Sequence, residues 1–249
     1  MKTSSVFLKT GITYFLWALG SPLFVVMLWS NSLLPASLRY DNRIYHFIAK
    51  LWARFLVKSS FVRFSVKGLE HVPNYPNQPS LILINHASML DIPLVEMLFK
   101  HYPRIWLCND YRRIPFFGTL LSRMHIVVQR NDVAQLVGAI RKAYALTKDK
   151  QRHLFMFPEG TRHHDGNIHD FYGGFAILAE KLKRPVIPVV LCGLHKILPK
   201  GSLVIDSSAC QVKISIGKPI NYADFASRQD FINAVQDRFK KELEQLKKE

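Results

Sequence analysis

The chain has 249 residues, 49% of them hydrophobic, which is enough to bury one sizeable core beside a small additional element. Lys and Arg outnumber Asp and Glu by 34 to 18, and the formal charge of +16 suits an anionic partner: a nucleic acid, an anionic bilayer or a phosphorylated substrate. Cys108, Cys192 and Cys210 are too few and too widely spaced for a disulfide framework or a Cys-x-x-Cys zinc site. They indicate a reducing compartment.

The first element is an apolar segment, 11–30, without a charged residue. Its length of about twenty residues matches the hydrocarbon thickness of a bilayer, whereas a signal peptide usually has a shorter apolar stretch before a small-residue cleavage site. We therefore expect a retained membrane anchor. Gly20, Ser21 and Pro22 lie in its middle, so a kinked or re-entrant helix fits the sequence as well as a straight span.

The charges on either side of this segment predict its orientation. Four cations follow it, Arg39, Arg43, Lys50 and Arg54, against Lys2 and Lys9 before it. By the positive-inside rule, the rest of the chain lies on the cytoplasmic face of the membrane, which in a bacterium is the inner membrane.

In 44–56, apolar residues recur at helical spacing with cations among them, which predicts an amphipathic basic helix. Such a helix either lies on the membrane surface or packs against the core, and the sequence favours neither. We therefore divide the chain into a membrane anchor with an amphipathic helix, 1–58, and a main domain, 59–249.

Strands and helices alternate through the main domain. Short apolar runs predict strands at 61–66, 81–84, 126–128, 154–157, 186–191 and 212–216. Helical periodicity occurs in 134–146, in 175–182 and in the tail after Tyr222. This order predicts an α/β fold with a mixed, largely parallel sheet flanked by helices.

The segment 85–91, Asn-His-Ala-Ser-Met-Leu-Asp, follows the strand 81–84 and precedes a helix with Pro93 in its first turn. In parallel sheets, ligands bind at the carboxyl ends of the strands. On a continuous helix His86 and Asp91 would lie about 140° apart, so they meet only if the strand-to-helix turn folds one back on the other.

If the two side chains meet, a carboxylate that holds the Nδ1 proton leaves Nε2 of His86 as the acceptor of a general base. The pair would be two thirds of a serine-hydrolase triad, with the substrate's own alcohol as the nucleophile. The alternative is that Asp91, with Ser88 three residues before it, caps the helix and that His86 is a core histidine.

A second polar turn, Phe-Pro-Glu-Gly-Thr-Arg at 157–162, also follows an apolar run, and Gly173 and Gly174 open the next predicted helix. Glycines allow close approach of a ligand, a helix N-terminus favours anions, and Arg162 offers a bidentate fork for phosphate. The alternative is a structural turn with an ion pair between Glu159 and Arg162.

Five blocks occur in a fixed order along the chain. They are Asn85-His86-x-x-x-x-Asp91, Ile-Pro-Phe-Phe-Gly at 114–118 with Arg130 twelve residues later, 157–162, Pro-Val-Ile-Pro-Val at 185–189, and Gly-Lys-Pro-Ile at 217–220. Together they resemble the glycerolipid acyltransferase family, whose best-known bacterial members are the 1-acyl-sn-glycerol-3-phosphate acyltransferases. The resemblance covers about 61–220, most of the chain.

The resemblance implies that His86 and Asp91 form a catalytic dyad. The residues that it implies for binding the glycerol phosphate of the acceptor are Glu159, Gly160, Thr161 and Arg162, with Arg130 close by. The implied reaction moves a fatty acyl chain from acyl-CoA or acyl carrier protein to the sn-2 hydroxyl of 1-acylglycerol-3-phosphate (lysophosphatidic acid), which gives phosphatidic acid. The family needs no metal or cofactor besides this co-substrate, and both donors are acidic, which fits the basic chain.

Two positions depart from the family's pattern. Many relatives carry lysines where this chain has Asn109 and Tyr172, so fewer cations face the acceptor unless Arg112, Arg113 or Lys181 replaces them. The alternative acceptor is therefore a lyso-ornithine lipid or another lysophospholipid.

In the implied mechanism, His86 takes the proton of the acceptor hydroxyl as its oxygen attacks the thioester carbonyl, and a tetrahedral oxyanion then expels the thiol. No acyl-enzyme is required. A route through Cys192 would need a base, and His195 belongs to no motif that pairs it with this thiol.

A rival class is a protein without catalytic activity that binds membranes or nucleic acid through its cations. Phe and Trp concentrate on helix stripes and in the apolar segment rather than between cations, unlike in a platform for stacked bases. We therefore expect a membrane partner and no nucleic-acid partner.

Overall fold

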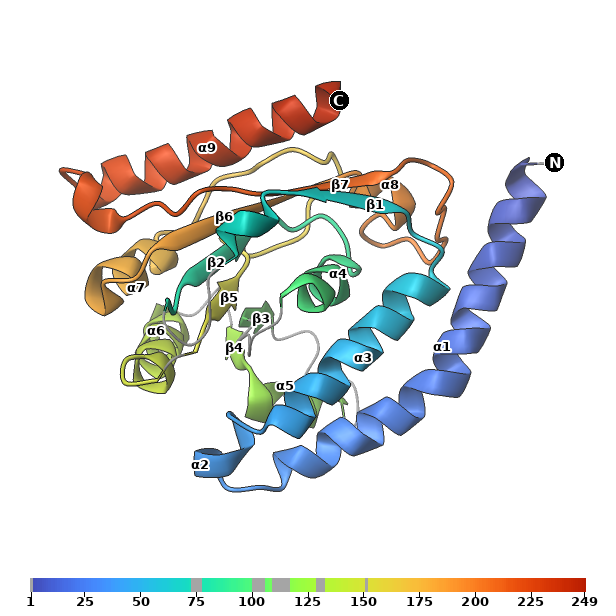
Figure 1. Cartoon of the computed structure of the whole chain (residues 1–249), viewed down its shortest axis with the longest axis horizontal. Coiled ribbons are helices and arrows are strands. Elements are labelled where there is room, and N and C mark those ends of the chain that lie inside the picture. Colours follow the sequence, from blue (N-terminus) through green and yellow to red (C-terminus); the bar gives the residue numbers. More distant parts are fainter. Residues whose placement is uncertain (1, 73–77, 100–105, 109–116, 129–132, 151) are drawn as a thin grey trace.

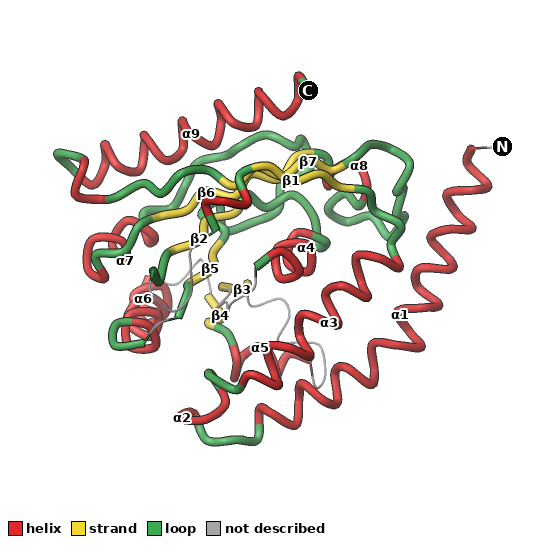
Figure 2. Tube along the Cα trace, in the orientation of Figure 1, coloured by secondary structure: helices red, strands yellow, loops and turns green. Residues whose placement is uncertain are grey.

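The computed structural model describes residues 2–72, 78–99, 106–108, 117–128, 133–150 and 152–249. A five-stranded sheet lies at the centre, with helices against both of its faces (Figure 1, Figure 2). Its strands are β1 (Phe64–Lys67), β2 (Leu81–Ile84), β5 (Leu154–Met156), β6 (Val186–Cys192) and β7 (Val212–Ile216), in the order β1-β7-β6-β2-β5. Every pairing in this sheet is parallel except that of β6 with β7, which confirms the predicted mixed, largely parallel sheet.

Two short strands, β3 (Trp106–Cys108) and β4 (Ile126–Val128), form a separate parallel pair. Both strands have three residues, and the sequence analysis predicts β4 but not β3. The predicted strand 61–66 begins too early. Phe61 has a φ of 55° and turns the chain out of the preceding helix, so β1 starts at Phe64.

The helices among the described residues carry the labels of Figure 1. They are α1 (Lys2–Ser32), α2 (Ala36–Arg39), α3 (Arg43–Ser59), α4 (Asp91–Leu98), α5 (Phe117–Met124), α6 (Val133–Thr147), α7 (Gly174–Leu182), α8 (Leu194–Ile197) and α9 (Arg228–Lys248). The terminal helix begins later than Tyr222, since 222–224 form a 3-10 turn and the Ser227 hydroxyl caps α9 by accepting from the backbone N–H of Asp230.

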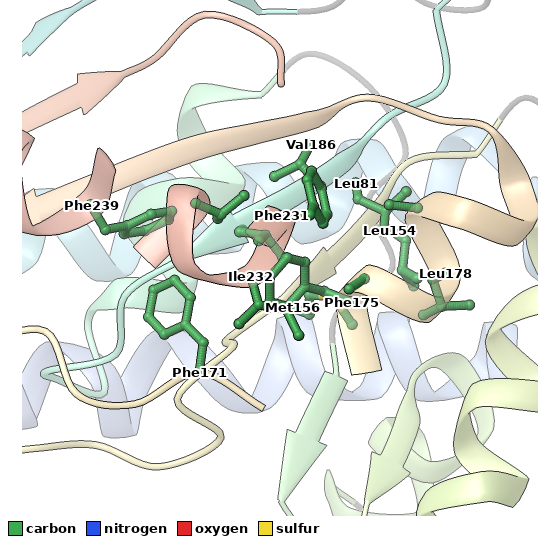
Figure 3. Packing of buried hydrophobic residues seen from close by; sticks show 14 of the residues in the cluster. Leu81, Leu154, Met156, Phe171, Phe175, Leu178, Val186, Phe231, Ile232 and Phe239 are labelled. Carbon is green, nitrogen blue, oxygen red and sulfur yellow. The ribbon is translucent and has the colours of Figure 1, made fainter. Parts of the chain in front are cut away.

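Strand β2 shows why its sequence is apolar at every position. Ile82 and Ile84 belong to the core cluster shared with α3 and α4, whereas Leu81 and Leu83 belong to the cluster shared with α6, α7 and α9. Side chains alternate between the faces of a strand, so a sheet covered on both sides needs apolar residues throughout. Figure 3 shows the second cluster, where Phe231 of α9 packs beside Phe175 of α7.

The N-terminal helix α1 is continuous through Pro22 and bends midway, as expected where a proline removes a backbone hydrogen bond (Figure 1). By length and composition α1 could cross a membrane. It packs along α3, where Trp17 Nε1 donates to Ser59 Oγ over 2.9 Å and Trp52 Nε1 donates to Ser21 Oγ over 3.1 Å.

Helix α3 has two different faces. Ile48, Ala53 and Val57 are buried in the molecule, while Ile44 and Phe47 are exposed. The packing interpretation of the amphipathic helix is thus confirmed for one face, and the other face is an apolar surface beside α1. The predicted boundary between 58 and 59 falls in the last turn of this helix.

Candidate active site

The two polar turns meet at one edge of the sheet, because β2 and β5 are neighbours and run parallel. The segment 85–91 follows β2, and the segment 157–162 follows β5. Asn85 fixes the first turn: its Oδ1 accepts from the backbone N–H of Leu191 over 2.7 Å, and its Nδ2 donates to the Leu191 carbonyl over 3.0 Å. The end of β2 is therefore tied to the end of β6.

His86 and Asp91 are in contact. Nδ1 of His86 lies 2.8 Å from Oδ2 of Asp91, and the same oxygen accepts from the backbone N–H groups of Ala87 and Ser88 over 2.7 and 2.8 Å. An ionised carboxylate oxygen has no proton to donate, so in its contact with His86 it acts as the acceptor, as it does with the two backbone N–H groups. The imidazole proton is therefore placed on Nδ1. Nε2 makes no hydrogen bond with the residues that the structure describes, and it is the open acceptor of a base.

This geometry goes beyond the capping alternative. The Asp91 carboxylate does accept from the backbone N–H of Ser88, as in a capping box, but the same oxygen also contacts Nδ1 of His86. Asp91 is the first residue of α4. The carboxylate is turned backwards, to the residues before the helix, and Asp91 is fully buried. The side chain of His86 keeps 11% exposure, so it is not a sealed core histidine.

The second turn supports the His86 ring from the side. Phe157 stacks on the imidazole with ring centroids 3.9 Å apart and an angle of 19° between the planes. The carboxylate of Asp91 and the ring of Phe157 thus hold the imidazole in one orientation.

Glu159 points into the protein, not outward. Its Oε1 accepts from the backbone N–H of His86 over 3.1 Å, and its Oε2 accepts from the backbone N–H of His169 over 3.3 Å. Burial raises the pKa of Glu159 to about 7, against the lowering effect of these hydrogen bonds. The alternative ion pair with Arg162 is absent from the described interactions, and the carboxylate instead joins the two turns.

The rest of the second turn is open to a ligand. Gly160 has a φ of 64° and donates its N–H to the Phe157 carbonyl over 2.9 Å, which closes the turn. Thr161 and Arg162 are half-buried. Arg162 makes no hydrogen bond or ion pair with any residue that the structure describes. The next residue, His163, donates its backbone N–H to the His86 carbonyl over 3.1 Å. Arg162 is therefore adjacent in sequence to a direct hydrogen bond with the dyad turn.

Several residues named from the sequence are not brought to this edge. Arg130, Asn109, Arg112 and Arg113 lie outside the described residues. Lys181 is in the last turn of α7, just before β6 begins, and therefore lies at the opposite edge of the sheet. Tyr172 is 56% exposed, and its backbone N–H donates to the Pro158 carbonyl over 2.9 Å, so it does border the second turn.

Cys192, at the end of β6, is a poor nucleophile. Burial raises the pKa of its thiol, which disfavours the thiolate. His195 packs instead against Gly166, where an added Cβ would lie 2.3 Å from the imidazole ring. Within the described residues, no group of three or more His, Cys, Asp or Glu side chains is placed to hold a metal ion.

An apolar cavity of about 300 Å³ adjoins the dyad turn. Its walls come from α1, α3, α4 and α5 and include Met89 and Leu90 of the turn, together with Trp17, Trp52 and Leu121. A cavity of this size and lining fits a hydrocarbon chain. The sequence gives no sign of it, because residues from four separate helices form it.

Comparison with known proteins assigns the family. Residues 63–192 match the family model described as Acyltransferase. The chain is 34% identical to the chloroplastic 1-acyl-sn-glycerol-3-phosphate acyltransferase BAT2 of Brassica napus, over 84% of this chain and 59% of the relative. It is 35% identical to LPAT1 of Arabidopsis thaliana, over 73% and 50%. The Helicobacter pylori enzyme of the same name is 31% identical, over 72% and 75%.

The chain thus spans 59% and 50% of the length of the two plant relatives. The crystal structure of the Thermotoga maritima 1-acyl-sn-glycerophosphate acyltransferase PlsC superimposes with a TM-score of 0.76 over 99% of this chain and 98% of that one, at 23% identity. This likeness confirms the fold. With the family model and the relatives, it establishes that the chain belongs to the glycerolipid acyltransferase family.

Proposed function

We propose that the protein transfers a fatty acyl chain from acyl-CoA or acyl carrier protein to the sn-2 hydroxyl of lysophosphatidic acid and so forms phosphatidic acid. The observation that carries this proposal is the His86–Asp91 pair, whose turn adjoins an apolar cavity. Among the described residues, neither Nε2 of His86 nor the Arg162 guanidinium has a hydrogen-bond partner. The names of the relatives support the acceptor.

In the proposed reaction, Nε2 of His86 takes the proton of the acceptor hydroxyl while its oxygen forms a bond to the thioester carbonyl carbon. The buried carboxylate of Asp91 stabilises the imidazolium that results. When the tetrahedral oxyanion collapses, the carbon–sulfur bond breaks and the imidazolium returns its proton to the leaving thiolate. This reaction needs no metal, no cofactor and no acyl-enzyme, because the thioester co-substrate supplies the activated acyl group.

The two substrates would bind on different sides of the dyad. The acyl chain enters the apolar cavity beside Met89, and the acceptor's phosphate meets Arg162, with Gly160 and Thr161 beside it. Arg130 is proposed for the same phosphate through the family resemblance. Glu159 would act by holding the dyad turn and the second turn together, since both of its oxygens are already occupied.

The proposed partner surface is an anionic bilayer, with the catalytic site on the cytoplasmic face. Its support is the apolar surface of α1 and α3, which includes Phe15, Leu19, Leu23 and Val26 on α1 and Ile44 and Phe47 on α3. A soluble protein rarely exposes so many contiguous apolar side chains. The lipid acceptor and an acidic donor fit the net charge of +16.

A second acceptor is supported by one position. Tyr172 borders the second turn without a charge where relatives carry lysine, so a lysolipid with a different head group is the alternative. An assay of the purified protein with palmitoyl-CoA or palmitoyl carrier protein and a panel of lysolipids separates the two. Preference for another lysolipid over lysophosphatidic acid would support the alternative.

The catalytic roles are tested by substitution. We expect His86→Ala to lower kcat by about 10² to 10⁴, the range of general base catalysis, and Asp91→Asn to lower it severely through the tautomer and orientation of the ring. His164→Ala is the matched control, because His164 is exposed in the second turn's loop and outside the dyad. Near-normal turnover by folded His86→Ala would overturn the mechanism.

A further inference from the structure

A short loop between α8 and β7 displays a large apolar side chain to solvent. Leu203 is 76% exposed, the highest value among the large apolar side chains that the structure describes. Most of the other exposed ones lie between Phe7 and Phe61, on the elements proposed to touch the membrane. Leu203 is the exception that lies far along the chain but close to α1.

Backbone hydrogen bonds hold the loop in a defined turn, with Leu203 exposed to solvent. Ser202 donates its N–H to the Pro199 carbonyl over 3.1 Å, with Gly201 at a φ of 81°, as in a type II turn. Asp206 donates its N–H to the Ile197 carbonyl over 2.8 Å, and Ile205 is buried. A folded turn therefore holds Leu203 out from a fixed base.

The loop is bound to α1 by a reciprocal pair of hydrogen bonds. Thr10 Oγ1 donates to the Ile205 carbonyl over 3.2 Å and accepts from the Ile205 N–H over 3.1 Å. The loop lies beside the N-terminal half of α1 in Figure 1. Lys9 precedes the bonded threonine and Lys200 lies in the turn, so cations flank the contact on both segments.

The base of the loop is bound to the active site. Ser88, in the dyad turn, donates its Oγ to the Leu198 carbonyl over 2.9 Å. One hydrogen bond therefore joins the base of the loop to the turn that carries His86.

We propose that the loop 198–206 is a second membrane contact, with Leu203 inserted between the head groups and acyl chains of an anionic phospholipid leaflet and Lys200 at the phosphates. This inference rests on the proposed membrane association of α1 and α3. Membrane contacts on α1 and α3 alone leave the tilt of the domain about these adjacent helices unset, whereas a second contact away from them sets it. The dyad turn then faces the leaflet that supplies its lipid acceptor.

Photo-crosslinking in the full chain tests the contact. The photoreactive residue p-benzoylphenylalanine replaces Leu203, and in separate samples Leu19 on the outer face of α1 or Val137 on α6, which are 72% and 41% exposed. Helix α6 lies away from the N-terminal half of α1 (Figure 1). Irradiation follows binding to vesicles of phosphatidylethanolamine and phosphatidylglycerol that contain a radiolabelled phospholipid.

We expect covalent lipid labelling at 203 and 19 and little at 137. Labelling at 19 without labelling at 203 would overturn the loop contact and leave the proposed membrane association intact. Labelling at neither position would reject the membrane association itself. Crosslinks from 203 to a second copy of the chain, in place of lipid, would show that the loop is a protein interface and overturn the inference.

The orienting role has its own measurement. Leu203→Asp should lower the transfer rate on vesicles but not in detergent micelles, which impose no fixed surface. Leu203→Met should restore the vesicle rate, and Val137→Asp is the matched control. Equal vesicle rates for Leu203→Asp and the unaltered protein would overturn the orienting role.

Discussion

At Glu159, one buried carboxylate accepts from two backbone N–H groups, one on each oxygen. The ionised form carries no proton, so both of its oxygens are free to accept. Glu159→Gln keeps the size but turns one acceptor into an NH₂ donor, which leaves the N–H of His86 or of His169 unpaired. An unpaired buried donor costs ~1 to 3 kcal/mol, so we expect kcat to fall about five- to a hundredfold. The acceptor KM should change much less, since this side chain holds the dyad turn.

The pH dependence separates this positioning role from general destabilisation. Because the pKa of Glu159 is raised to about 7, the unaltered carboxyl takes up a proton as the pH falls below that value and loses one acceptor. The ratio of kcat for Glu159→Gln to kcat for the unaltered enzyme should therefore rise towards one on acidification. A ratio that stays constant from pH 8 to pH 6, or a change confined to the acceptor KM, contradicts this role.

Arg162 is the residue proposed to bind the acceptor's phosphate. Hydrogen bonds to charged groups are worth ~1.5 to 3 kcal/mol, so Arg162→Ala should raise the acceptor KM about ten- to a hundredfold. Arg162→Lys should recover only part of this, because an ammonium keeps the charge but loses the fork. Lys181→Ala, at the opposite sheet edge, is the control with an unchanged KM. A rise in the donor KM alone would reverse the assignment of the two substrates.

The sequence predicts the parts of this site that depend on chain order. His86 and Asp91 lie in a turn after an apolar strand, which allows their contact, and the resemblance to the acyltransferase family is what predicts it. The direction of the Glu159 carboxylate cannot be predicted from the sequence. Its partners are backbone N–H groups, which every residue except proline carries. The same limit applies to Arg162, since its lack of a partner among the described residues depends on what surrounds it in three dimensions.

At the scale of elements, α1 and α3 pack closely at Gly20. A Cβ added there would lie 2.6 Å from Cζ of Phe55, whereas one added at Gly11 of the same helix meets nothing within 4 Å. Both glycines gain about 1 kcal/mol of helix propensity when changed to leucine, but overpacking costs ~1 to 3 kcal/mol at Gly20. Gly20→Leu should therefore unfold at a lower temperature than Gly11→Leu in the same detergent.

The cavity gives this comparison a functional readout. Trp17 and Ser21 flank Gly20 on α1 and line the cavity, so displacement of the helix changes the room for an acyl chain. Gly20→Leu should shift the preferred acyl donor in a panel of chain lengths, while Gly11→Leu should match the unaltered protein. Identical chain-length profiles for the two variants would show that the cavity does not hold the acyl chain.

Elements whose signal is local are well predicted, and pairings that depend on long connections are not. The strand 81–84 and the strand 212–216 coincide with β2 and β7 because each is a continuous apolar or alternating run between turns. The antiparallel pairing of β6 with β7 cannot be predicted from the sequence, since it depends on how α8 and the following loop return the chain to the sheet. The cavity has the same origin, in helices brought together by the fold.

For the whole molecule, the position of α1 bears on how the protein would meet the proposed bilayer. Both ends of α1 are bonded to the domain. Near the N-terminus Thr10 is bonded to Ile205, and near the other end Asn31 Nδ2 donates to Sδ of Met124 over 3.3 Å. A lone transbilayer helix would place these polar contacts in lipid or break them. The apolar outer face and the bonded inner face instead suit a helix embedded in one leaflet, with its bend at Pro22 following the domain surface.

This arrangement predicts that both termini lie on the same side of the membrane. In sealed vesicles that carry the full chain with different epitope tags at its two ends, added protease should remove both tags or neither from any one vesicle population. Extraction with alkaline carbonate should leave the protein with the membranes, because the apolar surface of α1 and α3 outlasts the loss of charge contacts. Protection of the N-terminal tag beside cleavage of the C-terminal tag would mean that α1 crosses the bilayer. In that case the hydrogen bonds of α1 to Ser59 and Ile205 could not persist in the membrane-bound state. The apolar cavity would also lose the wall that α1 supplies, and only α3, α4 and α5 would remain to line it.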